Sequence, residues 1–167
     1  MTARFRVSLL LFGLGVFLLD RVVKVYILNN FALGEVRAFL PGFMQLRYTQ
    51  NTGMAFGLLG DQQWLFIVLV PVLVVLLLVL IAKNIFPCPI CHLALVGIIA
   101  GGLGNWVDRL TWGFVVDMFE FTFVRFAIFN VADISITLGG ILFLVAHLVG
   151  EWRGGQSGKK VEGPSDE

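Results

Sequence analysis

The chain has 167 residues, of which 58% are hydrophobic and 14% are charged, and its net charge is +1. Soluble domains are typically about half apolar and about a quarter charged, so this composition, with a mean hydropathy of +0.91, excludes an ordinary soluble domain and indicates a membrane-embedded protein. No cluster of Lys and Arg suggests a nucleic-acid partner, and two cysteines are too few for a disulfide scaffold.

Four apolar segments are long enough for helices that cross a bilayer, which takes about 20 mainly apolar residues. They cover about residues 7–28, 64–82, 93–110 and 131–149. The first segment begins with the basic sequence MTARFR, as in a signal peptide, but no small-residue cleavage site follows it, so we expect a retained anchor. The sequence therefore predicts an all-α integral membrane protein with four transmembrane helices in a single domain, residues 1–150, and a disordered cytoplasmic tail, residues 151–167.

Two connecting segments, about residues 29–63 and 111–130, alternate apolar and polar side chains in stretches such as FMQLRYTQ and MFEFTFVRF. Such alternation predicts short strands. Their many Phe residues favour contact with the membrane surface. We therefore expect a small β-rich cradle or lid on the extracytoplasmic side.

The basic residues predict the orientation of the chain, because cytoplasmic loops carry an excess of Lys and Arg. Four spans place both termini on one side of the membrane. That side would carry Arg4, Arg6, Lys83, Arg153, Lys159 and Lys160, and the opposite side would carry Arg37, Arg47 and Arg125. We therefore expect both termini in the cytoplasm.

This arrangement brings the polar residues of three spans to one depth, near the outer face of the membrane. They are Asp20, Lys24, Asn105, Asp108, Arg109, Asp117, Asn130 and Asp133. Ionisable residues inside a membrane are functional-site candidates by default. Asp20 and Lys24 are four residues apart and can pair on one helix face. Gly97 and Gly101 have the spacing of closely packed membrane helices, so we expect the third and fourth spans to pack tightly.

Two carboxylates offer the best chemistry at this depth. Ser8 and Ser135 have no nearby His, and carboxylates without a His on the same side are a poor zinc set, so we expect neither metal nor cofactor. Two carboxyl groups that share a site hold one proton between them and can activate water, as in aspartic proteases. Proton or cation relay in a transport protein is the alternative, although a relay would spread polar groups across the membrane. A purely structural subunit would not explain why the acidic residues lie at the same depth in the membrane.

A second pattern, Cys88-Pro-Ile-Cys91-His92, fits the C-x-x-C-H pattern of c-type haem attachment. The expected orientation places it on the cytoplasmic side, and no second axial ligand is evident, so we expect no haem. Metal binding by Cys88, Cys91 and His92 stays open but lacks a fourth ligand.

Five sequence blocks resemble, in order, the motifs of the lipoprotein signal peptidase (signal peptidase II) family. They are DRVVK (20–24), NTGMAF (51–56), GGLGNWVDR (101–109), VVDM (115–118) and FNVADI (129–134). The resemblance implies a multi-pass aspartyl endopeptidase of the bacterial inner membrane, with its active site near the outer face. Such enzymes cleave the signal peptide of a prolipoprotein just before a cysteine that carries a diacylglyceryl group.

By position, the resemblance makes Asp117 and Asp133 the catalytic pair. The residues implied to line or order the site and to contact substrate are Asn51, Gly53, Asn105, Arg109 and Asn130. Those implied to give structural support are Asp20, Lys24 and Asp108, the last by orienting Arg109 or the following loop. The implied partners are a diacylglyceryl-prolipoprotein, membrane lipid and globomycin-type cyclic peptide inhibitors, and a monomer suffices. The chain departs from the family pattern at Arg21, usually Gln, and at Met54, usually Ala.

Overall fold

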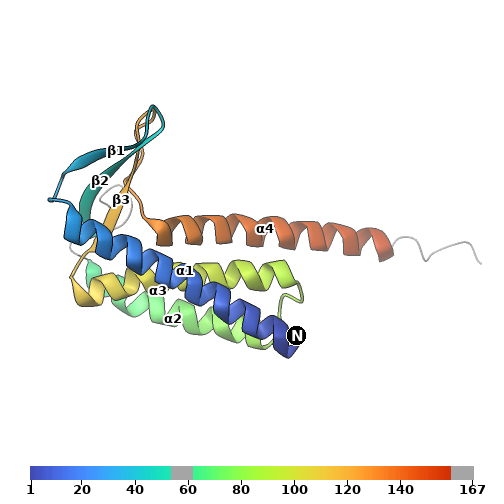
Figure 1. Cartoon of the computed structure of the whole chain (residues 1–167). Helices are drawn as coiled ribbons and strands as arrows, with labels where there is room; N and C mark the ends of the chain where they lie inside the picture. Colours follow the sequence, from blue (N-terminus) through green and yellow to red (C-terminus); the bar gives the residue numbers. More distant parts are fainter. Residues whose placement is uncertain (54–61, 159–167) are drawn as a thin grey trace, which may run out of the picture.

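Four helices and one small sheet make up the part of the chain that the computed structural model describes, residues 1–53 and 62–158. The elements, in chain order, are α1 (Ala3–Asn30), β1 (Val36–Leu40), β2 (Met44–Asn51), α2 (Gln63–Ala82), α3 (Pro89–Thr111), β3 (Val115–Phe121) and α4 (Val131–Gly158). The sheet lies at one end of the helices, while the start of α1 and the far part of α4 point away from it (Figure 1). The predicted combination of membrane helices with a small β-rich unit is confirmed.

Within the described residues, three helices are long and apolar enough to cross a membrane: α2, α3 and residues Val131–Gly150 of α4. None of the residues of α2 is buried within the protein, as expected for a helix surrounded by lipid. The remaining predicted span corresponds to α1, which has 28 residues but carries Asp20, Arg21 and Lys24. The side chains of Asp20 and Lys24 are fully buried against other elements, so these charges do not meet lipid.

Helix α3 is the centre of the bundle and contacts the other three helices. Its glycines allow a close approach to α4: a Cβ atom on Gly101 would lie 2.5 Å from the carbonyl oxygen of Ala132. On the opposing helix, a Cβ on Gly139 would lie 2.8 Å from the carbonyl oxygen of Ala94. The predicted tight packing of the third and fourth spans is confirmed, and it depends on small residues from both helices.

The sheet is antiparallel with the order β1-β2-β3, which confirms the strands expected in both connecting segments. In β2 and β3, Thr49 lies opposite Asp117, and Asn51 lies opposite Val115. A small core formed by Ile27 of α1, Tyr48 and the buried side of β3 joins the sheet to the end of α1. This core fixes the position of the strand that carries Asp117.

Two element boundaries differ from the prediction. Helix α3 begins at Pro89 rather than near residue 93, because Cys88 caps it and Pro89 occupies its first turn. Helix α4 continues to Gly158, beyond residue 151, where the sequence predicts that the tail begins. Each residue added to an existing helix gains a hydrogen bond, and this favours extension beyond the apolar run. Residues 159–167 lie outside the described part of the chain.

Candidate active site

The first turn of α4 holds Asp133 through reciprocal hydrogen bonds with Asn130. The Asn130 Oδ1 atom accepts from the Asp133 backbone N–H at 2.9 Å, and Asp133 Oδ2 accepts from the Asn130 backbone N–H at 3.2 Å. This is a capping-box arrangement. Asp20 of α1 accepts from the backbone N–H of Ala132 at 3.0 Å. The start of α4 is thus capped from its own sequence and from the first helix, and a carboxylate there interacts favourably with the helix dipole.

Asp117 lies in the middle of β3, and its side chain is only 2% exposed. Its two carboxyl oxygens accept hydrogen bonds from the side-chain amides of Asn51, at 2.9 Å, and Asn130, at 2.6 Å. The preceding residue, Val116, donates its backbone N–H to Asp108 Oδ2 at 3.3 Å. Asp117 is therefore held by β2, by the segment before α4 and, through its neighbour, by α3.

Asn130 contacts both acids, since its side chain donates to Asp117 and its backbone donates to Asp133. Asn105 of α3 donates to Asp133 Oδ1 at 2.8 Å. The oxygen of the same amide accepts from Lys24 Nζ at 2.7 Å and from Asn130 Nδ2 at 3.1 Å. Because an ammonium group can only donate, Lys24 fixes the Asn105 oxygen on its side and turns the amide nitrogen toward Asp133.

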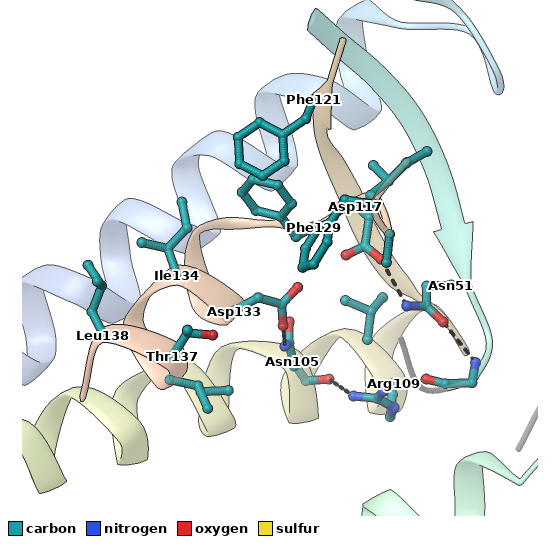
Figure 2. Close-up of a pocket in the computed structure, with 16 residues that line it drawn as sticks. Asn51, Asn105, Arg109, Asp117, Phe121, Phe129, Asp133, Ile134, Thr137 and Leu138 are labelled. Atoms are coloured by element: carbon teal, nitrogen blue, oxygen red, sulfur yellow. Dashed lines mark hydrogen bonds between the residues drawn. The ribbon is translucent and has the colours of Figure 1, made fainter. Parts of the chain in front are cut away.

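Both acids line a cavity of about 480 Å³. Figure 2 shows Asp117 and Asp133 entering this space from β3 and α4, with Asn51, Asn105 and Arg109 around them. The other wall is apolar and contains Phe121, Phe126, Phe129, Ile134 and Leu138. The cavity therefore combines a polar end that holds two carboxyl groups with an apolar end suited to hydrophobic side chains or alkyl groups.

Burial, and then the nearby charge of Asp133, raise the pKa of Asp117 to about 7, although hydrogen bonds from Asn51 and Asn130 oppose the shift. Two carboxyl groups in one site are not both ionised at low energetic cost, so protons are bound by the pair rather than by one residue. Near neutral pH the pair can thus offer one carboxylate and one carboxylic acid.

A buried ion cluster lies behind the two acids. Lys24 Nζ is 2.9 Å from both Asp20 Oδ2 and Asp108 Oδ2, which confirms the predicted pairing of Asp20 with Lys24. The Arg21 guanidinium pairs with Asp108 Oδ1, donates to the carbonyl oxygen of Gly104 at 3.3 Å and lies over the Trp112 ring. Two cations thus balance two anions. Asp108 bonds these cations and Val116 rather than Arg109, so the expectation that Asp108 orients Arg109 is corrected, whereas its hold on the following segment is observed.

Arg109 connects α3 to the segment that follows β2. It donates to the carbonyl oxygen of Gly53 at 3.1 Å and to that of Asn105 at 3.2 Å, and its guanidinium lies 4.6 Å from the centre of the Phe66 ring. Gly53 in turn donates its N–H to Asn51 Oδ1 at 2.9 Å. Arg109 and Asn51 therefore shape the wall of the cavity beside Asp117. Met54, the second departure from the family pattern, lies outside the described residues.

Neither the haem pattern nor its metal alternative gains support. Within residues 1–53 and 62–158, no group of three or more His, Cys, Asp or Glu side chains could hold a metal ion. Cys88 and Cys91 are free thiols, and the His92 ring packs 6.5 Å from the Phe5 ring. Among the described residues, Cys88, Cys91 and His92 are therefore not gathered into such a group.

Sequence reasoning did not identify two features of the site. Arg21 entered only as a departure from the family pattern, yet it is one of the two cations of the ion cluster. The apolar wall was also missed. The sequence does contain a pattern that indicates this wall. Ile134 and Leu138 are four residues apart and so share one face of α4, and Phe121 lies on the same strand as Asp117.

Comparison with known proteins gives a consistent result. The family model described as "Signal peptidase (SPase) II" matches residues 12–149. The chain is 47% identical over 148 residues to a lipoprotein signal peptidase of Streptococcus pneumoniae, covering 89% of this chain and 94% of that protein. It is 45% identical over 127 residues to a lipoprotein signal peptidase of Streptococcus pyogenes serotype M1, covering 76% of this chain and 84% of that protein.

Two solved structures have the same fold. A bacterial membrane enzyme determined at 2.3 Å by the in meso method superimposes with a TM-score of 0.82 and 27% identity, over 95% of this chain and 94% of that one. A second, determined at 1.9 Å, gives a TM-score of 0.77 and 29% identity, over 83% of this chain and 91% of that one. The match extends over the sheet and the helices together.

Proposed function

The chain belongs to the signal peptidase II family of aspartic peptidases, which process lipoproteins, and on that premise we propose that Asp117 and Asp133 are its catalytic pair. The protein is a multi-pass bacterial membrane enzyme that cleaves signal peptides from prolipoproteins. Asn130 carries the assignment of the pair, because it donates a hydrogen bond to each of the two carboxyl groups. The relay alternative is not retained, since the family is one of peptidases.

In the proposed mechanism, one water molecule lies between the two carboxyl groups. The ionised carboxylate accepts a proton from this water as its oxygen attacks the carbonyl carbon of the scissile peptide bond. The protonated carboxyl group donates its proton to the carbonyl oxygen. When the tetrahedral intermediate collapses, the C–N bond breaks and the leaving amine takes the proton held by one carboxyl group. The other carboxylate accepts a proton from a hydroxyl group of the intermediate as the new carbonyl forms, so the pair again holds one proton.

The neighbouring polar residues would fix the position of the two acids relative to the substrate backbone. Asn51 and Asn130 keep Asp117 in place, and Asn105 keeps Asp133 in place. Arg109 holds the cavity wall at Gly53. Asp20, Lys24 and Asp108 act behind them as structural support. Asn51, Asn105 and Arg109 line the cavity, whereas Asn130 is fully buried and is assigned to the site by its hydrogen bonds to both acids.

We further propose that the bond cleaved precedes a cysteine carrying a diacylglyceryl group. The apolar wall of the cavity, formed by Phe121, Phe129, Ile134 and neighbouring side chains, suits the hydrophobic residues of a signal peptide, and the alkyl chains can remain in lipid. Cyclic peptides of the globomycin type would compete for the same cavity. We also propose that a monomer suffices for activity.

The proposed orientation puts both termini in the cytoplasm and the sheet with the active site at the outer face. The excess of basic residues on one side favours this orientation. In a background in which Cys88 and Cys91 are replaced by serine, a cysteine introduced at Leu33, which is exposed beside the sheet, should react with an impermeant maleimide in intact cells or spheroplasts. A cysteine at Lys83, exposed at the end of α2, should react only after the membrane is opened. The reverse labelling pattern would refute the orientation.

The catalytic pair is tested with Asp117→Asn and Asp133→Asn, purified in detergent and given a diacylglyceryl-modified prolipoprotein in a gel-shift assay. Each variant should lose at least about 10³-fold in rate, since asparagine cannot exchange a proton. Glu120→Gln is the matched control, because Glu120 lies on the same strand but pairs with Gln45 and Arg47 outside the cavity. Cleavage at the wild-type rate by either Asp variant would refute the pair, and equal cleavage of unlipidated substrate would refute the lipid requirement.

A further inference from the structure

The end of α3 that lies away from the catalytic acids carries two thiols in a defined geometry. Cys88 is the N-cap of α3, with an extended backbone at φ −127° and ψ 119°, and Pro89 follows it inside the first turn. The residue before a proline is held in this extended region. The backbone N–H of Cys91 donates to Cys88 Sγ at 3.4 Å. The Cys88 sulfur is therefore directed over the first turn of α3, toward Cys91.

The two thiols differ in exposure. Cys88 is partly exposed, whereas Cys91 is 1% exposed. A hydrogen bond from the Cys91 thiol, the largest cause, lowers the pKa of Cys88, and backbone N–H groups at the helix start lower it further. A thiolate at a helix N-terminus is stabilised by the helix dipole, and the first sulfur of a Cys-X-X-Cys pair is activated in this way. The accessible sulfur is thus also the more nucleophilic one, with the second thiol directly behind it.

We propose that Cys88 and Cys91 form a redox-active dithiol that low-molecular-weight disulfides oxidise reversibly to an intramolecular disulfide. The Cys88 thiolate attacks one sulfur of the disulfide RSSR, the S–S bond breaks, and one RS⁻ leaves. Cys91 then loses its proton to solvent and attacks Cys88 Sγ, which releases the second RS⁻. Both thiolates take up protons, so two electrons pass from the dithiol to RSSR and two RSH are formed.

This chemistry is separate from peptide cleavage. Cys88 and Asn105 are 17 residues apart on α3, which corresponds to about 25 Å along a helix. Neither thiol lines the cavity that holds Asp117 and Asp133. The dithiol therefore goes beyond the proposed function, and its oxidation should leave the rate of prolipoprotein cleavage unchanged. Peptidase activity consequently serves as a check of folding for every cysteine variant.

The test uses the full-length protein, purified in detergent without oxygen and treated with oxidised glutathione. When thiols are counted with maleimide after denaturation, the wild type should lose both thiols, retain no glutathione by intact mass, and regain both thiols with dithiothreitol. Cys91→Ser should stop at a stable glutathione adduct on Cys88. Cys88→Ser should react roughly tenfold or more slowly, because Cys91 is buried. Cys91→Ala replaces Cys91→Ser if the serine variant lacks peptidase activity.

Three results would overturn the proposal. The first is a stable glutathione adduct on the wild-type protein, since Cys91 would then fail to resolve it. The second is no reaction of either thiol. The third is equal reactivity of the two single variants, which would show that the helix start does not distinguish Cys88 from Cys91.

Discussion

Replacing Lys24 with methionine tests how the buried ion cluster supports the proposed catalytic pair, Asp117 and Asp133. Methionine has a similar length but carries no charge and no hydrogen-bond donor. The change leaves Asp20 without its cation and removes one donor from the oxygen of Asn105. Because both members of the Asp20–Lys24 pair are fully buried, we expect a loss of about 3–5 kcal/mol in the free energy of unfolding.

The same change should also slow cleavage. Without Lys24, only the weaker hydrogen bond from Asn130 orients the Asn105 amide toward Asp133, so we expect a 10- to 100-fold lower kcat, as is typical of small displacements in an active site. The measurements are thermal unfolding in detergent, followed by tryptophan fluorescence, and the gel-shift assay at saturating substrate. Lys83→Met, at the exposed end of α2, is the control and should change neither quantity.

A second variant distinguishes the effect of charge balance on stability from the effect of the Asn105 orientation on kcat. In the Lys24→Met background, Asp20→Asn leaves one cation and one anion, Arg21 and Asp108. The double variant should therefore lose about 1–3 kcal/mol less stability than the two single losses added together. Its kcat should stay low, because Asn105 still lacks the hydrogen bond from Lys24. Additive stability losses, or a Lys24→Met variant that unfolds and cleaves like the wild type, would refute this account of the cluster.

Three further predictions concern the site and its supports. Because burial and the neighbouring carboxylate raise the pKa of Asp117 to about 7, ionisation of the whole pair should make kcat fall as the pH rises above that value; a rate that stays constant to pH 9 would contradict this. Gly101→Ala, whose new Cβ meets α4 at 2.5 Å, should lower both Tm and kcat, whereas Gly102→Ala, with its nearest atom at 3.7 Å, should lower neither. Arg109→Lys cannot keep both carbonyl contacts and should raise KM, because the wall at Gly53 loosens; an unchanged KM would refute this role.

The membrane helices and the meeting of the two acids were predictable because both follow from hydropathy and connectivity. Runs of about 20 apolar residues indicate spans, and alternating spans bring Asp20, Asn105 and Asp133 to the same end of the bundle. Helix spacing alone predicted the pairing of Asp20 with Lys24. These are local patterns that the tertiary structure does not override.

The remaining features depend on contacts between distant parts of the chain. No local pattern indicates that Asp20 accepts the N–H of Ala132 or that Arg21 pairs with Asp108. The length of α4 was underestimated because polar and glycine-rich sequence usually indicates disorder, whereas a helix already formed extends at little cost. The family pattern located the residues of the site, but their partners required the three-dimensional structure.

The cap that Asp20 provides for α4 also bears on the order in which the site is assembled during synthesis. The first helix made by the ribosome supplies the acceptor, and the last helix supplies Ala132, whose N–H it binds, together with Asp133. A nascent chain that has inserted only its first three helices contains Asp117 without a second acid. On the proposed assignment of the catalytic pair, a chain that lacks α4 has only one of the two acids, so cleavage of prolipoproteins should begin only after α4 has been made.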